Sequence, residues 1–422
     1  MSYAYATGYR NFTCNQVLEK LTLNYASMKG NSNKYYKIEL QEGIGDFNYR
    51  IYTEYGRMGG TQRKEDRYYN SYGEAFDDYH KIVLQKKRKG YEEIELADSI
   101  EGNTPIKLNV SNRLDLSKIN DKVLKFIAKI YSYSTDFLAK SITTPLGELS
   151  SAQVAKGTKV LTEIEKALDN GYGNFDYLSD EFYSIIPVVF GLKANYKELI
   201  IDNYYKLNEK KDLLGVISSV VSVQNELLNT IEEKYKTLGI NLKAVSKNSK
   251  EYKRIIKKVK ETKALNHHFD LKVKEIYEVS DMIGYDKFNP YKVSTMELFH
   301  GSRNENILGI LKNGLKIKPH SAIHTGSMFG SAIYLADSST KSANYCWGFD
   351  SNGNNDEYFL LVCEAATGKI KEYEDCKTNL TKAPHGYNSV MGKKGRSLIN
   401  NEYMVYNENQ VKIKYIVEFT RS

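Results

Sequence analysis

Several residue types that mark particular classes of protein are scarce in this chain of 422 residues. It has only four cysteines, which stand apart without a Cys-x-x-Cys pair, together with six prolines and one tryptophan. Isolated cysteines argue against a disulfide framework and a zinc ribbon, and they favour a reducing compartment. No long apolar run occurs, so we expect no membrane span, and the first residues lack the charged-then-apolar pattern of a signal peptide.

Histidine is also scarce, and the charge balance is modest. Two of the seven histidines, His320 and His324, are four residues apart, but Pro319 and Gly326 place them in a loop rather than on a helix face. We therefore expect no metal site. The formal net charge is +8, from 60 Lys and Arg against 52 Asp and Glu. That balance permits a polyanionic partner, but only clustering of the charge would indicate one.

The amino-terminal part shows strand patterns followed by a helix pattern. Residues 35–57 read as strands, and Phe47–Tyr55 alternates between an aromatic or β-branched face and a polar face. From Tyr72 the apolar spacing becomes helical and ends at the basic run before Gly90, a plausible helix stop. The basic run, residues 86–89, fits either positive charge at a helix end or a nuclear address.

The composition then changes twice along the chain. A polar segment with Pro105 predicts a linker, and the stretch beyond it has helical spacing with a candidate N-cap at Ser150-Ser151. Later segments read as strands without regular β/α alternation, which favours an α+β domain with mostly antiparallel strands. These strands are expected at 241–245, 269–279, 356–365 and 409–419. The predicted parts are an amino-terminal tail (1–14), a small antiparallel sheet plus helix (15–97), a linker (98–112), an all-α bundle (113–232) and the α+β domain (233–422).

One stretch, LFHGSRNENILGIL at residues 298–311, carries chemistry-bearing residues at a strand-to-helix turn. Taken alone it could be a phosphate loop, a hydrolase nucleophile, a metal ligand or a plain turn. A phosphate loop needs more glycines and a Lys-Ser/Thr pair, and a nucleophile elbow needs Gly-x-Ser-x-Gly. Neither pattern is present, because Ser302 is followed by Arg303 and Asn304.

The downstream motifs MFGSAIYLADSSTKSANYCW (328–347) and SLINNEYMVY (397–406) give this stretch a context. In these settings, His300, Tyr334 and Glu402 resemble the His-Tyr-Glu triad of the poly(ADP-ribose) polymerase family of ADP-ribosyltransferases. LSSAQVAKG and FYSIIPVVFG resemble that family's regulatory helical domain. YYKIEL and YGR resemble its nucleic-acid-sensing domain, which is named for Trp-Gly-Arg. The resemblance covers roughly residues 15–422.

The resemblance implies that NAD is the substrate and that the nicotinamide–ribose bond is cleaved without a metal. The backbone of Gly301 would pair with the nicotinamide carboxamide, and Ser342 would donate its hydroxyl to the same group. Tyr345 would stack on the ring and Tyr334 would form the opposite wall. Glu402 would stabilise the positive charge that develops on the ribose and would bond its 2′-hydroxyl.

Four further residues have supporting or uncertain roles. His300 would bond the adenosine ribose with help from Ser302, and Lys341 would contact Glu402 or the acceptor. Lys316 stands where the family often has an arginine facing adenosine. Lysine keeps the positive charge but lacks the planar guanidinium that can form two parallel hydrogen bonds.

Three other departures bear on function. Ser327 replaces a stacking tyrosine, and only a short segment joins residue 395 to Asn400, where the family commonly has a longer acceptor-site loop. We therefore expect a poly(ADP-ribosyl)transferase stimulated by DNA breaks, with a mono- or oligo-transferase as the alternative. Gly215 and Ser219 occupy positions that are acidic in DNA-activated members, which suggests that autoinhibition is weaker or works by sterics alone. A catalytically weak protein that binds nucleic-acid ends is the alternative of another class.

At the amino-terminus, Tyr55 stands in place of the family's tryptophan and is followed by Gly56 and Arg57. An aromatic ring can stack on a terminal sugar, and Arg57, Arg50 and Arg63 could contact phosphates. The expected partners are DNA ends or nicks and protein acceptors, including the chain itself, but no membrane. The resemblance implies a nuclear location in a eukaryote and otherwise a cytoplasmic one, not secretion.

Overall fold

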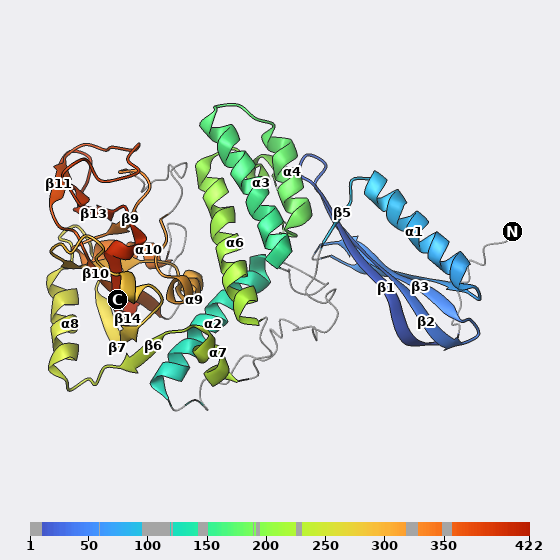
Figure 1. The fold of residues 1–422 in the computed structure, drawn as a ribbon, viewed down its shortest axis with the longest axis horizontal. Helices are drawn as coiled ribbons and strands as arrows, with labels where there is room; N and C mark the ends of the chain where they lie inside the picture. Colours follow the sequence, from blue (N-terminus) through green and yellow to red (C-terminus); the bar gives the residue numbers. More distant parts are fainter. Residues whose placement is uncertain are drawn as a thin grey trace. The chain divides into compact units, whose positions relative to one another are not determined.

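The computed structural model describes residues 11–58, 60–94, 119, 121–141, 151–188, 190, 195–224, 230–317, 328–347 and 357–422 (Figure 1). The chain divides into two compact units. One comprises Met1–Val110 with Leu138–Val221, and the other comprises Ser111–Phe137 with Ser222–Ser422. The linker predicted at 98–112, together with Ser327, His320 and His324, lies outside the described residues. No helix of the described part is long and apolar enough to cross a membrane.

The first unit contains an antiparallel sheet with one helix on one face (Figure 1). Its strands β1 (Phe12–Ser27), β2 (Ser32–Gly45), β3 (Tyr49–Arg57), β4 (Gln62–Tyr69) and β5 (Glu92–Glu93) lie in the order β4-β3-β2-β1-β5. Helix α1 (Tyr72–Arg88) packs through Tyr79 and Ile82 on the apolar face of the sheet, which includes Ile38 and Ile51. Gly90, with φ +84°, follows the helix end, so the predicted helix stop is confirmed.

Three strands of this sheet, β1, β4 and the two-residue β5, are absent from the sequence prediction. The carboxyl-terminal half of β1 is buried, but its first half, around Asn15, is mostly exposed, so no clear alternation runs along it. The sequence of β4, QRKEDRYY, is almost wholly polar because this strand lies at the sheet edge with exposed side chains. An edge strand rich in charge is protected against pairing with other chains but carries little hydrophobic signal.

Helices complete the first unit. They are α3 (Ser151–Asp169), α4 (Phe175–Ile185), α5 (Tyr196–Leu199) and α6 (Tyr204–Gln224). The buried amide of Asn24 on β1 donates to the carbonyls of Tyr183 (2.9 Å) and Ser184 (3.1 Å), near the end of α4. The last carbonyls of a helix lack partners within it, so Asn24 satisfies them and fixes α4 to the sheet.

The second unit is built on two sheets, which confirms the predicted α+β class. The larger, in the order β6-β7-β14-β10-β8, is antiparallel throughout. Its strands are β6 (Asn241–Ala244), β7 (Leu271–Asp281), β8 (Met296–Gly301), β10 (Tyr358–Ala365) and β14 (Val411–Arg421). Four of these, all except β8, match the four strands expected at 241–245, 269–279, 356–365 and 409–419.

The smaller sheet has the order β11-β12-β13-β9, with β11 and β12 parallel. Its strands are β9 (Ile333–Leu335), β11 (Ile370–Tyr373), β12 (Ser389–Gly392) and β13 (Glu402–Val405). The two sheets are joined where Phe299 and Ala336 exchange backbone hydrogen bonds of 2.8 and 2.9 Å. Helices α7 (Ile231–Thr237), α8 (Lys250–Glu261), α9 (Asn304–Asn313) and α10 (Ser339–Trp347) complete the unit with the short 3-10 turns η3 (Tyr285–Lys287) and η4 (Glu408–Gln410).

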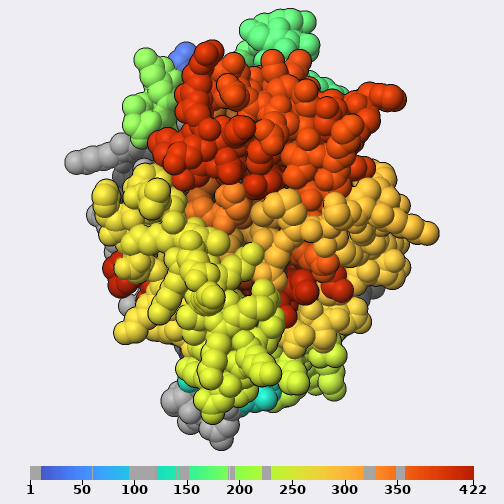
Figure 2. Space-filling model, turned by 90° about the vertical axis from the view of Figure 1, so that its left-hand side faces the viewer, coloured from blue at the N-terminus to red at the C-terminus, as the bar shows by residue number. Residues whose placement is uncertain are grey.

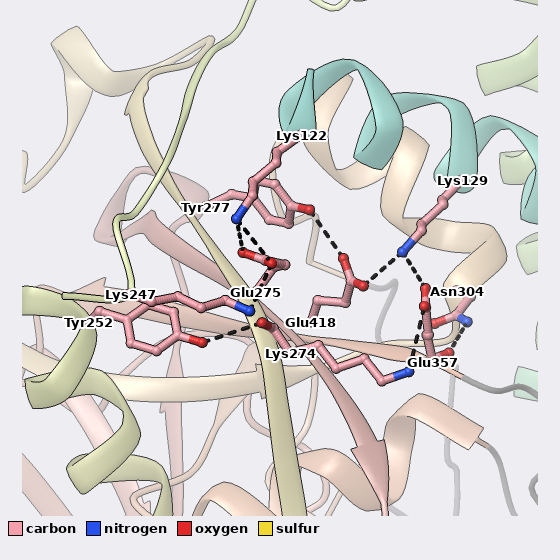
Figure 3. Close-up of polar contacts among 10 residues, drawn as sticks. All are labelled: Lys122, Lys129, Lys247, Tyr252, Lys274, Glu275, Tyr277, Asn304, Glu357 and Glu418. Carbon is pink, nitrogen blue, oxygen red and sulfur yellow. Dashed lines mark hydrogen bonds and ion pairs between the residues drawn. The ribbon is translucent and has the colours of Figure 1, made fainter. Parts of the chain in front are cut away.

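Helix α2 (Lys122–Ser141) packs through its first part against the strands of the second unit. Phe126 is fully buried and stacks on Tyr277 with ring centroids 4.6 Å apart. Lys129 pairs with Glu357 and, at 2.7 Å, with Glu418, which also accepts a hydrogen bond from Tyr277 (Figure 3). The first part of α2 therefore packs with the strands of the second unit, whereas α3, α4 and α5 belong to the first unit.

Helix α10 is held at its start by the segment before β7. His267 Nδ1 lies 2.8 Å from the Thr340 hydroxyl, whose oxygen also accepts the Ala264 N–H. Burial, and then the positive charge of Lys341, lowers the pKa of His267. The neutral imidazole is therefore the form that the folded chain favours.

Lys129→Ala should destabilise the chain strongly, because it leaves the buried carboxylate of Glu418 without its cation. Breaking a buried pair in this way costs about 3–5 kcal/mol. Urea denaturation measures the loss. Lys125→Ala, one turn earlier in α2, is the matched control because Lys125 makes no ion pair among the described residues. Equal effects of the two substitutions would show that the ion pair does not hold the helix.

Acidification should destabilise the chain through His267. The unfolded chain takes up this proton near the ordinary pKa of 6.5, whereas the folded chain takes it up only at lower pH. Stability is therefore lost as the pH falls below about 6.5 toward the folded pKa. His267→Gln should flatten the fall of the thermal midpoint with pH, and the exposed neighbour His268→Gln should not. A fall of the same size in His267→Gln would refute this assignment.

Candidate active site

Glu402 is the first residue of β13, at the centre of the smaller sheet. It lies opposite Gly392 on one side, and on the other side Met404 pairs with Tyr334 of β9. Residues two apart on a strand share a face, as do residues directly opposite each other. The side chains of Glu402 and Tyr334 therefore lie on the same face. Only 5% of Glu402 is exposed.

A lysine from α10 holds the Glu402 carboxylate. Lys341 Nζ lies 2.9 Å from Oε1 of Glu402 and also donates to the backbone carbonyls of Asn400 and Asn401, at 3.1 and 3.2 Å. Burial lowers the pKa of Lys341, and the attraction of Glu402 acts in the opposite direction. The cation therefore fixes both the carboxylate and the two residues that precede it.

The other carboxylate oxygen of Glu402, Oε2, is buried and has no hydrogen-bond partner among the described residues. A buried acceptor without a donor costs on the order of 1–3 kcal/mol. Such an atom in a folded protein calls for an explanation, and a site that receives a hydroxyl from a ligand is one. The geometry thus offers a fixed, buried acceptor beside an ion-paired oxygen.

His300 is brought to this face by the junction of the two sheets. Its Nδ1 lies 2.9 Å from the carbonyl oxygen of Tyr334. A carbonyl only accepts, so Nδ1 carries a proton and donates it to this bond.

Two hydrogen bonds fix the hydroxyl end of the Tyr334 ring. Its hydroxyl donates to the Gly330 carbonyl (2.8 Å) and accepts the Phe329 N–H (3.0 Å). Burial, and then the charge of Glu402, raises the pKa of this phenol, which therefore stays neutral. Tyr334 is suited to act as a wall of the site rather than as an acid.

Gly301 ends β8, next to α10. The backbone N–H and C=O of Phe299 point away from β10 and bond to Ala336. Residues two apart on a strand direct these groups to the same side, so the N–H and C=O of Gly301 also point away from β10. A Cβ on Gly301 would lie 1.7 Å from the Ser342 carbonyl oxygen. The glycine is therefore required by the packing of α10, in addition to the reason of ligand approach that the sequence suggested.

Ser342 and Tyr345 lie three residues apart on α10. The Ser342 hydroxyl donates to the Phe299 carbonyl at 3.0 Å, so it meets a ligand as an acceptor unless this bond is exchanged. Tyr345 is 39% exposed, and burial followed by the charge of Glu402 raises its pKa to about 12. Ser302 accepts a hydrogen bond from the Asn306 side chain at 3.2 Å, in the first turn of α9.

Among the described residues, no contact joins Lys316 to this group. Its ammonium pairs with Glu408 at 2.9 Å, and Glu408 also accepts the N–H of Ile317. Conversely, the sequence reading missed Asp337, whose carboxylate accepts from Asn401 (3.0 Å) and from the Tyr403 hydroxyl (3.2 Å). These bonds brace the residues on either side of Glu402. Only the proximity of β9 and β13 in the fold reveals them.

The amino-terminal candidates do not form one group. Tyr55 and Arg63 face each other across β3 and β4. Tyr55 stacks on Tyr36 with centroids 5.5 Å apart, and Lys86 lies 3.8 Å from the Tyr36 centroid. The basic end of α1 thus lies beside Tyr55, and the sequence reading did not connect the two.

The other two arginines have partners within the first unit. Arg57 donates to the carbonyl and side-chain oxygens of Asn31 (2.6 and 2.9 Å), and its guanidinium lies 5.9 Å from the Phe190 ring. Arg50 is on the opposite face of β3, where it bonds Gln41 and lies over Phe12. Among the described residues, no group of His, Cys, Asp and Glu side chains is arranged to hold a metal.

Three family models match the chain in sequence order. They are the WGR domain (residues 19–98), the regulatory domain of poly(ADP-ribose) polymerase (117–238) and its catalytic domain (249–397). Curated relatives include poly [ADP-ribose] polymerase 2 of Arabidopsis thaliana, 28% identical over 94% of this chain and 72% of the relative.

Two animal relatives are longer than this chain. Poly [ADP-ribose] polymerase 1 of Xenopus laevis is 29% identical over 94% of the chain, and poly [ADP-ribose] polymerase of Sarcophaga peregrina is 29% identical over 93%. The aligned region spans 45% and 42% of these relatives, less than half of their length. Together with the ordered matches to three domains, these relatives show that the chain belongs to the poly(ADP-ribose) polymerase family.

Proposed function

We propose that this chain is an NAD-dependent protein poly(ADP-ribosyl)transferase. The observation that carries the proposal is the buried Oε2 of Glu402, an unpartnered acceptor in the described structure. The ion pair with Lys341 holds it on the face that Tyr334 shares. Membership of the family supports NAD as the substrate, and we propose proteins, including the chain itself, as acceptors.

The chemistry is a substitution at C1′ of the nicotinamide ribose. The bond from C1′ to the ring nitrogen breaks, nicotinamide leaves with the electron pair, and positive charge develops on the ribose. The fixed carboxylate of Glu402 stabilises that charge electrostatically while Oε2 accepts the ribose 2′-hydroxyl. The acceptor nucleophile then bonds to C1′ and releases its proton.

The remaining site residues hold the two ends of NAD. Tyr345 and Tyr334 supply aromatic walls for nicotinamide, and the outward backbone groups of Gly301 pair with its carboxamide. His300, with Nδ1 bonded to the Tyr334 carbonyl, presents Nε2 to a hydroxyl of the adenosine ribose. Positioning of this kind lowers the barrier because the reacting groups are held together before reaction.

Polymer length is governed on the acceptor side, where β12 and β13 are joined by residues 393–401. Backbone N–H groups of Lys393, Lys394 and Gly395 bond to Tyr373, Asn401 and Leu398 respectively, each at 2.8 Å. This short, hydrogen-bonded connection favours the second candidate function, transfer of one or a few ADP-ribose units.

The amino-terminal sheet supplies the proposed control by DNA ends or nicks. Tyr55, Arg63 and the basic end of α1 lie together and offer an aromatic face beside positive charge. Since Gly215 and Ser219 replace acidic residues, we propose that stimulation by broken DNA is modest. The family supports a nuclear location in a eukaryotic host.

One experiment separates the candidate functions. The chain is incubated with labelled NAD, with and without nicked DNA, and the products are resolved on a gel. A ladder or smear supports polymer synthesis, and one sharp labelled band supports mono-transfer. No label in either lane would leave only nucleic-acid binding.

Glu402→Gln should abolish elongation and lower turnover of NAD by about 100- to 1000-fold, because an amide keeps the shape but loses the charge. Single-turnover release of nicotinamide measures the loss. Glu374→Gln, an exposed glutamate of the same unit, is the matched control and should behave as the unsubstituted chain. Unchanged ladders in Glu402→Gln would refute the assigned role.

Lys341→Met should lower turnover of NAD near pH 7 by roughly 10- to 100-fold, because it removes the cation that positions the buried Glu402 carboxylate and the two carbonyls before it. Single-turnover release of nicotinamide measures the loss. The exposed Lys292→Met is the control. Unchanged turnover in Lys341→Met would contradict the ion-pair account.

A further inference from the structure

The modest net charge of the chain conceals a strong local excess. Residues 243–272 contain ten Lys and Arg against three Asp and Glu, a net charge of +7, whereas the whole chain carries +8. Almost all of the excess positive charge is therefore gathered in one segment of the second unit. The segment runs from β6 through α8 into the start of β7.

Helix α8 (Lys250–Glu261) is amphipathic, with an apolar side that is buried and a basic side that is exposed. Tyr252, Ile255 and Val259 are buried against the strands. Four exposed lysines with spacings of three, four and three residues lie along one side of the helix, because residues three or four apart are neighbours on a helix surface. This lysine stripe consists of Lys250, Lys253, Lys257 and Lys260. Figure 2 shows the yellow segment that contains α8 at the surface of the molecule.

The other cations of the segment are largely neutralised by neighbouring carboxylates. Arg254 pairs with Glu251 and Glu297, each at 2.8 Å, and Lys258 also pairs with Glu297. Lys247 pairs with Glu275 at 3.0 Å.

Among the described residues, one lysine of the stripe forms an ion pair: Lys257 lies 3.7 Å from Glu261, and both side chains are exposed. An exposed pair of this kind is weak. Most of the positive charge of the stripe is therefore available to a partner, whereas neighbouring carboxylates pair with the cations beside it.

A hollow continues the lysine stripe at the end of α8. It has a volume of about 460 Å³, and its lining includes Lys260, Lys263, Lys272 and Thr340. Lys263 is held by Asp270 at 2.7 Å, whereas Lys260 and Lys272 are exposed. A run of cations that ends in a concave surface suits an extended polyanion better than a single small ion.

We propose that the lysine stripe is a second nucleic-acid surface, located on the catalytic unit, that contacts the phosphate backbone of a duplex. The ten helical steps from Lys250 to Lys260 span about 15 Å. That length matches about four phosphates of one strand, spaced at about 3.4 Å along the duplex axis. Lysine ammonium groups act as point charges toward phosphates, so this surface binds without reading base sequence.

Salt dependence of binding tests the proposal on the full chain. The probe is a labelled short blunt duplex, and its affinity is measured between about 50 and 200 mM salt. The quadruple variant K250Q/K253Q/K257Q/K260Q should reduce the slope of log affinity against log salt by roughly 3 to 4. Across that range the unsubstituted chain should therefore lose on the order of 100-fold more affinity than the variant.

The matched control removes the same charge from exposed lysines elsewhere, in K159Q/K166Q/K197Q/K292Q, and should leave the slope nearly unchanged. Far-UV circular dichroism checks that both variants are folded. An equal slope in the stripe variant and the unsubstituted chain would overturn the proposal.

Lysine acetylation read by mass spectrometry locates the contact independently of the amino-terminal sheet. The duplex should slow acetylation of Lys250, Lys253, Lys257 and Lys260 several-fold and leave Lys292 unaffected. If free ADP-ribose polymer slows acetylation of these lysines and the duplex does not, the proposal is wrong and the stripe binds the polymer instead of nucleic acid. Absence of protection by either would show that the stripe is only a solvated face.

Discussion

The buried ion pair between Lys341 and Glu402 is the contact on which the proposed active site depends. It joins α10 to the start of β13, and the same ammonium holds the carbonyls of the two residues before Glu402. A carboxylate that is 5% exposed is costly to keep charged unless a cation accompanies it. Lys341 stabilises the charge through Oε1 and leaves Oε2 for a ligand.

Other contacts around the site place residues that the proposed chemistry needs, while also serving the fold. The exchange of backbone bonds between Phe299 and Ala336 joins the two sheets and brings His300 to the carbonyl of Tyr334. Gly301 allows α10 to approach β8 so closely that any Cβ would collide with Ser342. A substitution at Gly301 would thus disturb the helix that carries Ser342, Tyr345 and Lys341 even before NAD is considered.

The sequence predicted the α+β class and the principal strands of the second unit because β10 is an almost continuous buried apolar run, and β7 and β14 carry β-branched and aromatic residues between their charged ones. It could not reveal β4, a polar strand at a sheet edge with five charged side chains among eight, nor the packing of the first part of α2 on the strands of the second unit. Lys129 is an ordinary lysine in a helical pattern, and only the fold shows that it meets Glu357 and Glu418 across more than 200 residues of chain.

The site residues illustrate the same limit. The resemblance named His300, Tyr334 and Glu402 from motifs, and the structure brings them to the junction of two sheets. Asp337 carried no comparable signal, because its partners Asn401 and Tyr403 are side chains of common type that lie beside it only through the pairing of β9 and β13. Contacts between distant polar side chains depend on strand register, and a single sequence does not display that register.

The most direct test of the central claim is a crystal structure of the chain with a non-hydrolysable NAD analogue. The account predicts that a hydroxyl of the nicotinamide ribose lies at about 2.5–3.0 Å from Glu402 Oε2 while Lys341 remains paired with Oε1. An analogue bound with its ribose away from Glu402, or a carboxylate still lacking a partner at Oε2, would contradict it.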